Sequence, residues 1–374
     1  MSHKAPFAIP SEDAIAHSMA LIEYIIAAIE SHQGCLSFRN YMNMALYQPG
    51  LGYYVAGSHK IGMQGDFITA PEVSPLFGQC IAHACQISYP NLSEQILFEL
   101  GAGSGALCVS ILQALQQSGN LPKQYWILEP SPDLQARQRD KISRTIPECL
   151  DQVCWLNTLP TQPFEGIILA NEILDALPVH RFCVNHAGIQ MLGVSYDGQR
   201  FQWQTRQSVQ PEFEHAVTAL QQTVGKNWHL PYTSEINLAL PAWLEAITGM
   251  LSNGKVILID YGYEQPEYYH SQRNQGTLMC HYRHQAHSDP FMYPGLQDIT
   301  AHVDFTKVAH CAESLNLTVE SYQSQAHFLL DNQLAQYANT TEKAQQMRWL
   351  THPNHFGEVF KVMILNKCTK TKKA

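Results

Sequence analysis

The chain has 374 residues, which is enough for one large domain or two ordinary ones. It carries 23 Lys and Arg against 32 Asp and Glu, a formal net charge of −9, so the basic surface that a phosphate backbone requires is not indicated and nucleic acid is disfavoured as a partner. Ten cysteines without a C-x-x-C pair indicate reduced thiols and no zinc framework. With no leader-like start and no apolar run of about 18 residues, we expect a cytoplasmic protein without an integral membrane segment.

The N-terminal part predicts two helices and a loop. Residues 11–33 form an amphipathic pattern with Ser11 as cap, and its stripe comprises Ile15, Met19, Ile22, Ile26 and Ile29. This helix could pack on the core or form a homodimer contact. A second helix is expected over 38–47, followed by a glycine-rich segment that could act as a lid. Ser74-Pro75 then opens a helix through about Tyr89.

From Gln95 onward, short apolar runs alternate with helical segments. The expected strands are 96–100, 125–129, 153–157, 166–170 and 256–260, with two late strands at 317–323 and 359–365 after a helix near Phe305. Continuous apolar runs are typical of parallel strands that are covered on both faces. The pattern therefore predicts an α/β fold with a seven-stranded, mostly parallel, doubly wound sheet.

The spacing of these runs also predicts the domain organisation. Residues 1–73 would supply the N-terminal helices and the lid loop, and residues 74–368 the main domain. Two insertions are expected in that domain, at about 179–240 with a hairpin and a helix, and at 262–300 with a loop-like composition. Residues 369–374 would form a basic tail.

A glycine-rich turn follows the first expected strand, in the stretch FELGAGSGAL. Gly101, Gly103 and Gly105 permit a tight turn, and the next helix would point its N–H groups at a ligand. The spacing departs from the dinucleotide fingerprint. Glu99 before the turn would repel a pyrophosphate but suit the positive groups of S-adenosylmethionine, and Glu129 could accept the ribose hydroxyls. The glycines alone fit any tight turn, but together with the two acids they favour S-adenosylmethionine over a nicotinamide cofactor.

Several sequence blocks resemble one family. The blocks are ELGAGSGAL, YWILEPSPDLQARQ, GDFITAPEVSPLFG, NEILDALPVHRF, DYGY and PGLQDITAHVDF. Together they resemble the MidA family of S-adenosylmethionine-dependent protein arginine methyltransferases, whose mitochondrial members are complex I assembly factors. The resemblance spans about residues 35–365. It implies a class I methyltransferase fold and an arginine on a protein acceptor, such as a complex I subunit, in a bacterial member of the family.

A guanidinium acceptor must be oriented and its charge matched, which carboxylates can do. Glu172 and Asp175 follow the fourth strand at the carboxyl edge of the sheet, and on a helix they would share a face. We expect them to hold the acceptor, with Asn171 binding the cofactor. The plainer alternative is that Glu172 caps a helix and Asp175 is solvated.

Other polar residues are weaker candidates. Glu72, in GDFITAPEVSPLFG, could face the sulfonium or the arginine, and otherwise belongs to a capping loop. His302 could accept the released proton, since histidine titrates near neutrality, or lie on the surface. Asp260 ends the fifth strand, where it could act in the site or cap the next loop. The histidines of HYRHQAH could share a helix face, but no Cys or acid completes a metal site, so no metal is expected.

Three other functions remain open. The chain could be a non-catalytic assembly chaperone that retains the cofactor fold, an RNA methyltransferase, or a nicotinamide oxidoreductase. The intact glycine turn and its two acids argue against the first, the acidic balance against the second, and Glu99 against the third. The sequence names neither the acceptor protein nor the methylation state.

Overall fold

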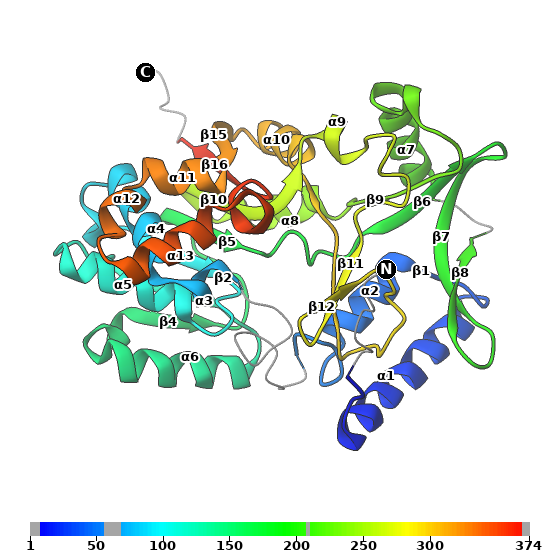
Figure 1. Ribbon diagram of the computed structural model, residues 1–374, viewed down its shortest axis with the longest axis horizontal. Coiled ribbons are helices and arrows are strands. Elements are labelled where there is room, and N and C mark those ends of the chain that lie inside the picture. Colours follow the sequence, from blue (N-terminus) through cyan, green and yellow to red (C-terminus); the bar gives the residue numbers. More distant parts are fainter. Residues whose placement is uncertain (1–7, 56–68, 207–209, 369–374) are drawn as a thin grey trace.

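The computed structural model describes residues 8–55, 69–206 and 210–368. Its central sheet has seven strands in the order β15-β16-β10-β5-β2-β3-β4, with the short β14 beside β10. The bounds are β2 Ile96–Leu100, β3 Gln124–Leu128, β4 Val153–Leu156, β5 Phe164–Asn171, β10 Leu251–Tyr263, β14 Val303–Asp304, β15 Thr318–Ser324 and β16 Phe360–Lys367. β2, β3, β4, β5 and β10 are parallel, and β16 is antiparallel to both of its neighbours. The predicted seven-stranded sheet is confirmed (Figure 1).

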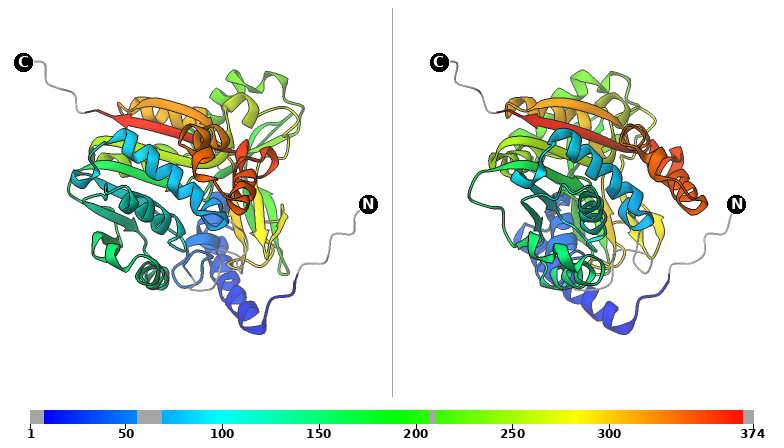
Figure 2. Two further views of the ribbon diagram at one scale, coloured as in Figure 1. Left: turned by 60° about the vertical axis from the view of Figure 1, so that its left-hand side comes forward. Right: turned by 90° about the vertical axis from the view of Figure 1, so that its left-hand side faces the viewer.

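Helices cover both faces of this sheet (Figure 2). Along β5, Ile167 and Leu169 belong to one core, and Ile168 and Ala170 to the other, so every side chain of the run is buried. This explains why the strand is continuously apolar. The helices are α4 Pro75–Ser88, α5 Ala106–Gln117, α6 Pro132–Thr145, α11 Gln325–Asp331, α12 Leu334–Tyr337 and α13 Thr341–Thr351 over the first core, and α8 Leu240–Gly249 and α10 Phe305–Ser314 over the second. The short α3, Ala70–Val73, leads into α4.

The two insertions build sheets of their own. The first forms β6 His180–Asn185, β7 Gly188–Tyr196, β8 Phe201–Thr205, α7 Pro211–Thr223 and β9 Tyr232–Ile236. These strands join the N-terminal β1, Leu36–Ser37, in a five-stranded sheet, of which β6, β7 and β8 are green at the right of Figure 1. The second insertion was expected to be loop-like, and this was wrong. It contains α9 Gln265–Tyr268 and a three-stranded sheet of β11 Met279–Tyr282, β12 Gln285–His287 and β13 Asp298–Thr300.

The first helix, α1 Glu12–Ser31, is capped by Ser11 as predicted. The predicted stripe is confirmed only in part, because Ile22, Ile26 and Ile29 pack against the core whereas Ile15 and Met19 are exposed. Its fully buried apolar residues are Leu21, Ile25 and Ile29, whereas Met19 is 56 % exposed. α1 packs against the N-terminal core with α2, Phe38–Tyr47. By length and composition α1 could span a bilayer, with a mean hydropathy of 1.3, but a docked helix of a soluble protein passes the same test.

Candidate functional site

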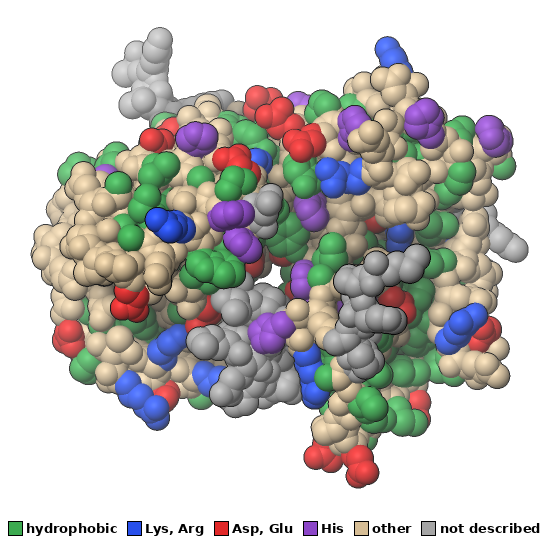
Figure 3. All heavy atoms as spheres, viewed as in Figure 1, with side chains coloured by type: hydrophobic (Ala, Val, Ile, Leu, Met, Phe, Trp, Pro, Cys, Tyr) green, Lys and Arg blue, Asp and Glu red, His purple; other side chains and the backbone are tan. Residues whose placement is uncertain are grey.

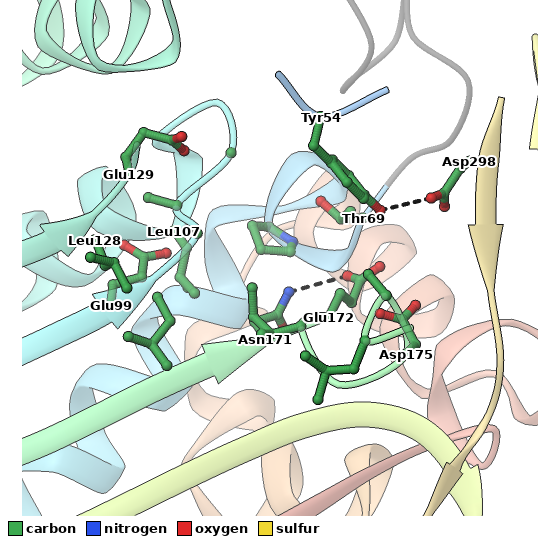
Figure 4. Close-up of a pocket in the computed structure, with 18 of the residues that line it drawn as sticks. Tyr54, Thr69, Glu99, Leu107, Leu128, Glu129, Asn171, Glu172, Asp175 and Asp298 are labelled. Atoms are coloured by element: carbon green, nitrogen blue, oxygen red, sulfur yellow. Dashed lines mark hydrogen bonds between the residues drawn. The ribbon is translucent and has the colours of Figure 1, made fainter. Parts of the chain in front are cut away.

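A cavity of about 930 Å³ lies at the carboxyl ends of β2, β3 and β5. Parallel sheets place ligands at this edge. Figure 4 shows that Glu99 and Glu129 come from one side of the cavity and Glu172 and Asp175 from another, with Tyr54 and Asp298 approaching from elements outside the main sheet. Figure 3 shows a hollow in this face, with histidine side chains beside it. These four predicted carboxylates, together with Glu72, therefore line one cavity.

The glycine turn between β2 and α5 has the backbone that only glycine adopts easily. Gly101, Gly103 and Gly105 have φ of 62°, 53° and 80°. A Cβ on Gly101 would lie 2.7 Å from Ile173 Cδ1. The Gly103 carbonyl accepts a hydrogen bond from Gln138 Nε2 at 2.9 Å, which ties the turn to α6. The result is an open backbone cradle at the N-terminus of α5, which fits a nucleoside cofactor.

Glu129 directly follows β3 and lines the cavity. Its Oε1 accepts the Ser131 N–H at 2.9 Å, and its Oε2 lies 3.4 Å from Gln138 Nε2. Burial raises the pKa of this carboxyl, and those two donors oppose the shift. The side chain is thus held in place with acceptor capacity left for ribose hydroxyls. Its predicted role in cofactor binding remains a prediction.

Glu99 is buried within β2 and borders the cavity. Its Oε2 accepts a hydrogen bond from the Tyr125 hydroxyl at 2.8 Å. Burial raises the pKa of Glu99 to about 7, although the hydrogen bond from Tyr125 opposes this. The carboxyl is therefore only partly ionised at neutral pH in the free protein, and a nearby cation would favour its charged form. The electrostatic argument against a pyrophosphate is weaker than the sequence suggested.

The segment after β5 is a turn, so the expectation of a helix that presents Glu172 and Asp175 on one face was wrong. Glu172 has a φ of 55°, in the left-handed region that costs a side-chain-bearing residue about 1–2 kcal/mol. Its Oε1 accepts a hydrogen bond from Asn171 Nδ2 at 3.1 Å. The turn nevertheless places Asn171, Glu172 and Asp175 on the cavity wall. Backbone strain of this kind is often found where a side chain must be aimed.

The acids of this turn are poorly neutralised. Burial and the neighbouring Asp175 raise the pKa of Glu172 to about 8, while Asn171 opposes the shift. Burial also raises the pKa of Asp175 to about 6. Within the described part of the chain, Asn171 Oδ1 and Asp175 Oδ1 are buried without a hydrogen-bond donor. No Lys or Arg is among the described residues that line the cavity. This end of the cavity therefore has no Lys or Arg among its described lining residues, and its side-chain donors are the Asn171 amide and the hydroxyls of Tyr54 and Tyr261.

Two further residues of the cavity had no role assigned from the sequence. Asp298 opens β13, and Tyr54 follows the N-terminal helices. The Tyr54 hydroxyl donates to Asp298 Oδ1 at 2.7 Å, and both residues line the cavity (Figure 4). The negative charge of Asp298 also contributes to the raised pKa of Glu172. The only sequence signal for these residues was the family block that contains Asp298.

Glu72 borders the cavity, but its carboxylate is already occupied. It accepts a hydrogen bond from the Ser104 hydroxyl, and Lys141 Nζ lies 3.7 Å from its Oε1. Lys141 also donates to Ser104 Oγ at 3.0 Å. These contacts connect α3 to the glycine turn and to α6, which favours a role in shaping the cofactor end. Asp66 of the same sequence block lies outside the described residues.

His302 lines the cavity beside the aromatic rings of Tyr261 and Tyr263. Burial and the nearby Arg273 lower the pKa of His302 to about 4. The imidazole is therefore neutral at physiological pH and a weak base. This weighs against its predicted role as the proton acceptor.

The three histidines considered for metal binding do not lie on a helix. His281 belongs to β11 and His287 to β12, which form an antiparallel hairpin with His284 in its turn. Among the described residues there is no group of three or more His, Cys, Asp or Glu that could hold a metal ion.

Comparisons with known proteins agree with this geometry. Residues 78–323 match the model of a family of S-adenosyl-L-methionine-dependent methyltransferases. A Burkholderia thailandensis protein, solved with S-adenosyl-homocysteine bound, is 37 % identical with a TM-score of 0.90, over 97 % of this chain and 95 % of that one. The Danio rerio mitochondrial protein arginine methyltransferase NDUFAF7 is 28 % identical over 73 % of this chain and 67 % of its own length. Its Drosophila melanogaster homolog is 26 % identical over 89 % of this chain and 82 % of its own length.

Proposed function

Because the chain belongs to this family of S-adenosyl-L-methionine-dependent methyltransferases, we propose that it methylates an arginine on a protein acceptor. The observation that carries the proposal is the acidic end of the cavity. Glu172 and Asp175 lie there with raised pKa values, and no described Lys or Arg lines the cavity to neutralise them. The names of the curated relatives support an arginine acceptor.

A guanidinium satisfies this end of the cavity better than other common acceptors. It is planar, always charged, and presents several N–H donors that match carboxylate oxygens. Its charge would lower the pKa of Glu172 from about 8 and return the carboxyl to its ionised form. An RNA acceptor would instead bring phosphates toward buried carboxylates, which is unfavourable.

The two ends of the cavity have different roles, one in binding the cofactor and the other in orienting the acceptor. The glycine turn and Glu129 bind the cofactor. S-adenosylmethionine would supply the methyl group: its carbon–sulfur bond would break as a carbon–nitrogen bond forms, and the electron pair of the broken bond would stay on sulfur. Glu172 and Asp175 orient the guanidinium, and one of these carboxylates accepts the proton that the nitrogen loses. Orientation of the two reactants supplies much of the rate.

One finer feature of the proposal rests on the family resemblance, namely a complex I subunit as the acceptor. The cytoplasm as the location is a proposal that rests on the sequence pattern alone. A homodimer through α1 and the absence of an integral membrane segment both remain predictions.

The experiment combines labelled S-adenosylmethionine with an extract from a strain that lacks this protein, followed by mass spectrometry of the labelled band. We expect the label on an arginine of a protein. Glu172→Gln should reduce transfer by about 100-fold while S-adenosyl-homocysteine still binds, since the cofactor end is unchanged. Glu165→Gln, at the exposed opposite end of β5, is the matched control.

Three outcomes would overturn the proposal. Label on RNA or on another amino acid would identify a different acceptor. Full transfer by a folded Glu172→Gln protein would remove the role of this carboxylate. Calorimetric binding of S-adenosylmethionine without transfer to any component of the extract would favour the assembly chaperone.

A further inference from the structure

We propose that Asp260 is a positioning residue, which holds the turn after β5 in the conformation that aims Glu172 and Asp175 at the acceptor. The inference rests on the proposed function, because it assumes that these two carboxylates orient the acceptor. Asp260 lies on β10, the strand beside β5, and its side chain is fully buried. It acts through the turn and not by contact with the acceptor.

Two of the three hydrogen bonds that the Asp260 side chain accepts come from the neighbouring turn. Its Oδ2 accepts the N–H groups of Leu174 at 2.9 Å and of Asp175 at 3.2 Å. Its Oδ1 accepts the N–H of Tyr261 at 2.9 Å. The sequence suggested that Asp260 could cap the loop after its own strand, whereas two of its three acceptor contacts are made to the turn that follows β5.

Other groups hold the same turn at its remaining points. The Glu172 N–H donates to the Ile259 carbonyl at 2.9 Å. At the far end, the Ala301 N–H donates to the Asp175 carbonyl at 3.0 Å, and the Tyr47 hydroxyl donates to the Ala176 carbonyl at 3.0 Å. The middle of the turn, at Leu174 and Asp175, is fixed through its N–H groups by Asp260.

This support is needed because the turn is strained. Glu172 has a φ of 55°, which a side-chain-bearing residue leaves readily when the surrounding contacts permit. Burial and the charges of Asp175 and Glu172 also make the Asp260 carboxylate costly, since they raise its pKa. Asp260 nevertheless stands beside these two acids, and its oxygens accept three backbone N–H groups there.

Asp260→Asn tests the inference with almost no change in shape. An amide keeps one acceptor oxygen but turns its NH₂ group toward an N–H donor, so at least one of the three contacts becomes repulsive. We expect methyl transfer to fall by roughly 100-fold, as for a misplacement of about 1 Å, while the affinity for S-adenosyl-homocysteine changes little. Asp304→Asn is the matched control, because Asp304 also caps backbone N–H groups, at the start of α10.

A double-mutant cycle separates positioning from general destabilisation. If Asp260 acts through Glu172, adding Asp260→Asn to Glu172→Gln should cost much less transfer than Asp260→Asn costs alone. A merely structural effect would lower both backgrounds by the same factor. If Asp260→Asn does not fold, Tyr47→Phe is tested instead, because it removes a hydrogen bond from the far end of the same turn. We then expect methyl transfer to fall by about 10-fold, again with a smaller loss in the Glu172→Gln background.

The outcomes distinguish this inference from the function itself. Full transfer by folded Asp260→Asn, or equal losses in the two backgrounds, would overturn the positioning role even if Glu172→Gln is inactive. Full methyl transfer by Glu172→Gln would overturn the role of Glu172 in orienting the acceptor, and with it the positioning role of Asp260. A loss in Asp304→Asn as large as that in Asp260→Asn would show that the effect is one of stability.

Discussion

The raised pKa of Glu172 has a measurable consequence for stability. The carboxyl has a pKa of about 8 in the folded protein, against an ordinary value of 4.5. Between these values the folded state keeps a proton that the unfolded state has lost, so unfolding becomes easier as the pH rises through this window. Glutamine does not titrate. Glu172→Gln should therefore be more stable than the original protein above about pH 8, with little difference near pH 4.5.

The size of the effect follows from the linkage between protonation and folding. Each pH unit within the window changes the free energy of unfolding by up to about 1.4 kcal/mol. Because Glu172 is partly exposed and shares its charge with Asp175, we expect a total difference of about 2–3 kcal/mol between the two proteins at alkaline pH. The strained backbone and the hydrogen bond from Asn171 are retained in the variant, since the glutamine oxygen can still accept.

Urea unfolding of the cofactor-free protein at about pH 5, 7 and 8.5 measures this difference. Glu165→Gln, which changes an exposed carboxylate of the preceding strand β5, should follow the original protein at every pH. Parallel curves for Glu172→Gln and the original protein across the whole range would refute the reasoning, because they would show an ordinary pKa for this carboxyl.

Three further predictions concern the remainder of the cavity. Gly101→Ala should cost about 1 kcal/mol of stability for its left-handed backbone and weaken S-adenosyl-homocysteine binding by about 10-fold, measured by urea unfolding and calorimetry; unchanged affinity would contradict a close approach of the ligand. Tyr125→Phe removes the hydrogen-bond donor to Glu99 and so raises the pKa of Glu99 further. Binding of S-adenosylmethionine should therefore weaken by about 5-fold at pH 7 and by less at higher pH. Equal weakening at every pH would contradict this explanation. His302→Gln should leave the pH profile of transfer between about pH 6 and 8 unchanged, since the imidazole has a pKa of about 4 and stays neutral there; loss of one limb of the profile would restore its role as a base.

The central sheet was predictable because its physical signal is local. A strand buried on both faces must be apolar at every position, as β5 is, and only a few residues of sequence are needed to see this. The stripe on α1 was partly misjudged because an apolar helix offers more than one face at helical spacing. The neighbouring α2 and β7, with the segment at Gly295, decide that Leu21 and Ile25 are buried and Met19 is exposed.

The site was predictable only where a single segment builds it. The glycine turn follows β2, and the acids Glu129, Glu172 and Asp175 follow β3 and β5, so their positions at the strand ends could be inferred from the sequence. The wall formed by Tyr54 and Asp298 depends on how the N-terminal segment and the second insertion meet, and no periodicity records that contact. The pKa of His302 likewise depends on its burial and on Arg273. Arg273 is distant in the sequence, and burial cannot be read from the sequence at this position.

The two ends of the cavity share one electrostatic design. Glu99 at the cofactor end has a pKa of about 7 and Glu172 at the acceptor end has a pKa of about 8, so both are held near the point of ionisation by burial. In a free cavity that state is costly, because buried acids without cations are unfavourable. A sulfonium at one end and a guanidinium at the other would each favour the charged carboxylates. If the proposed arginine acceptor binds there, part of the binding energy of the two positive ligands would be used to ionise the carboxyls of Glu99 and Glu172.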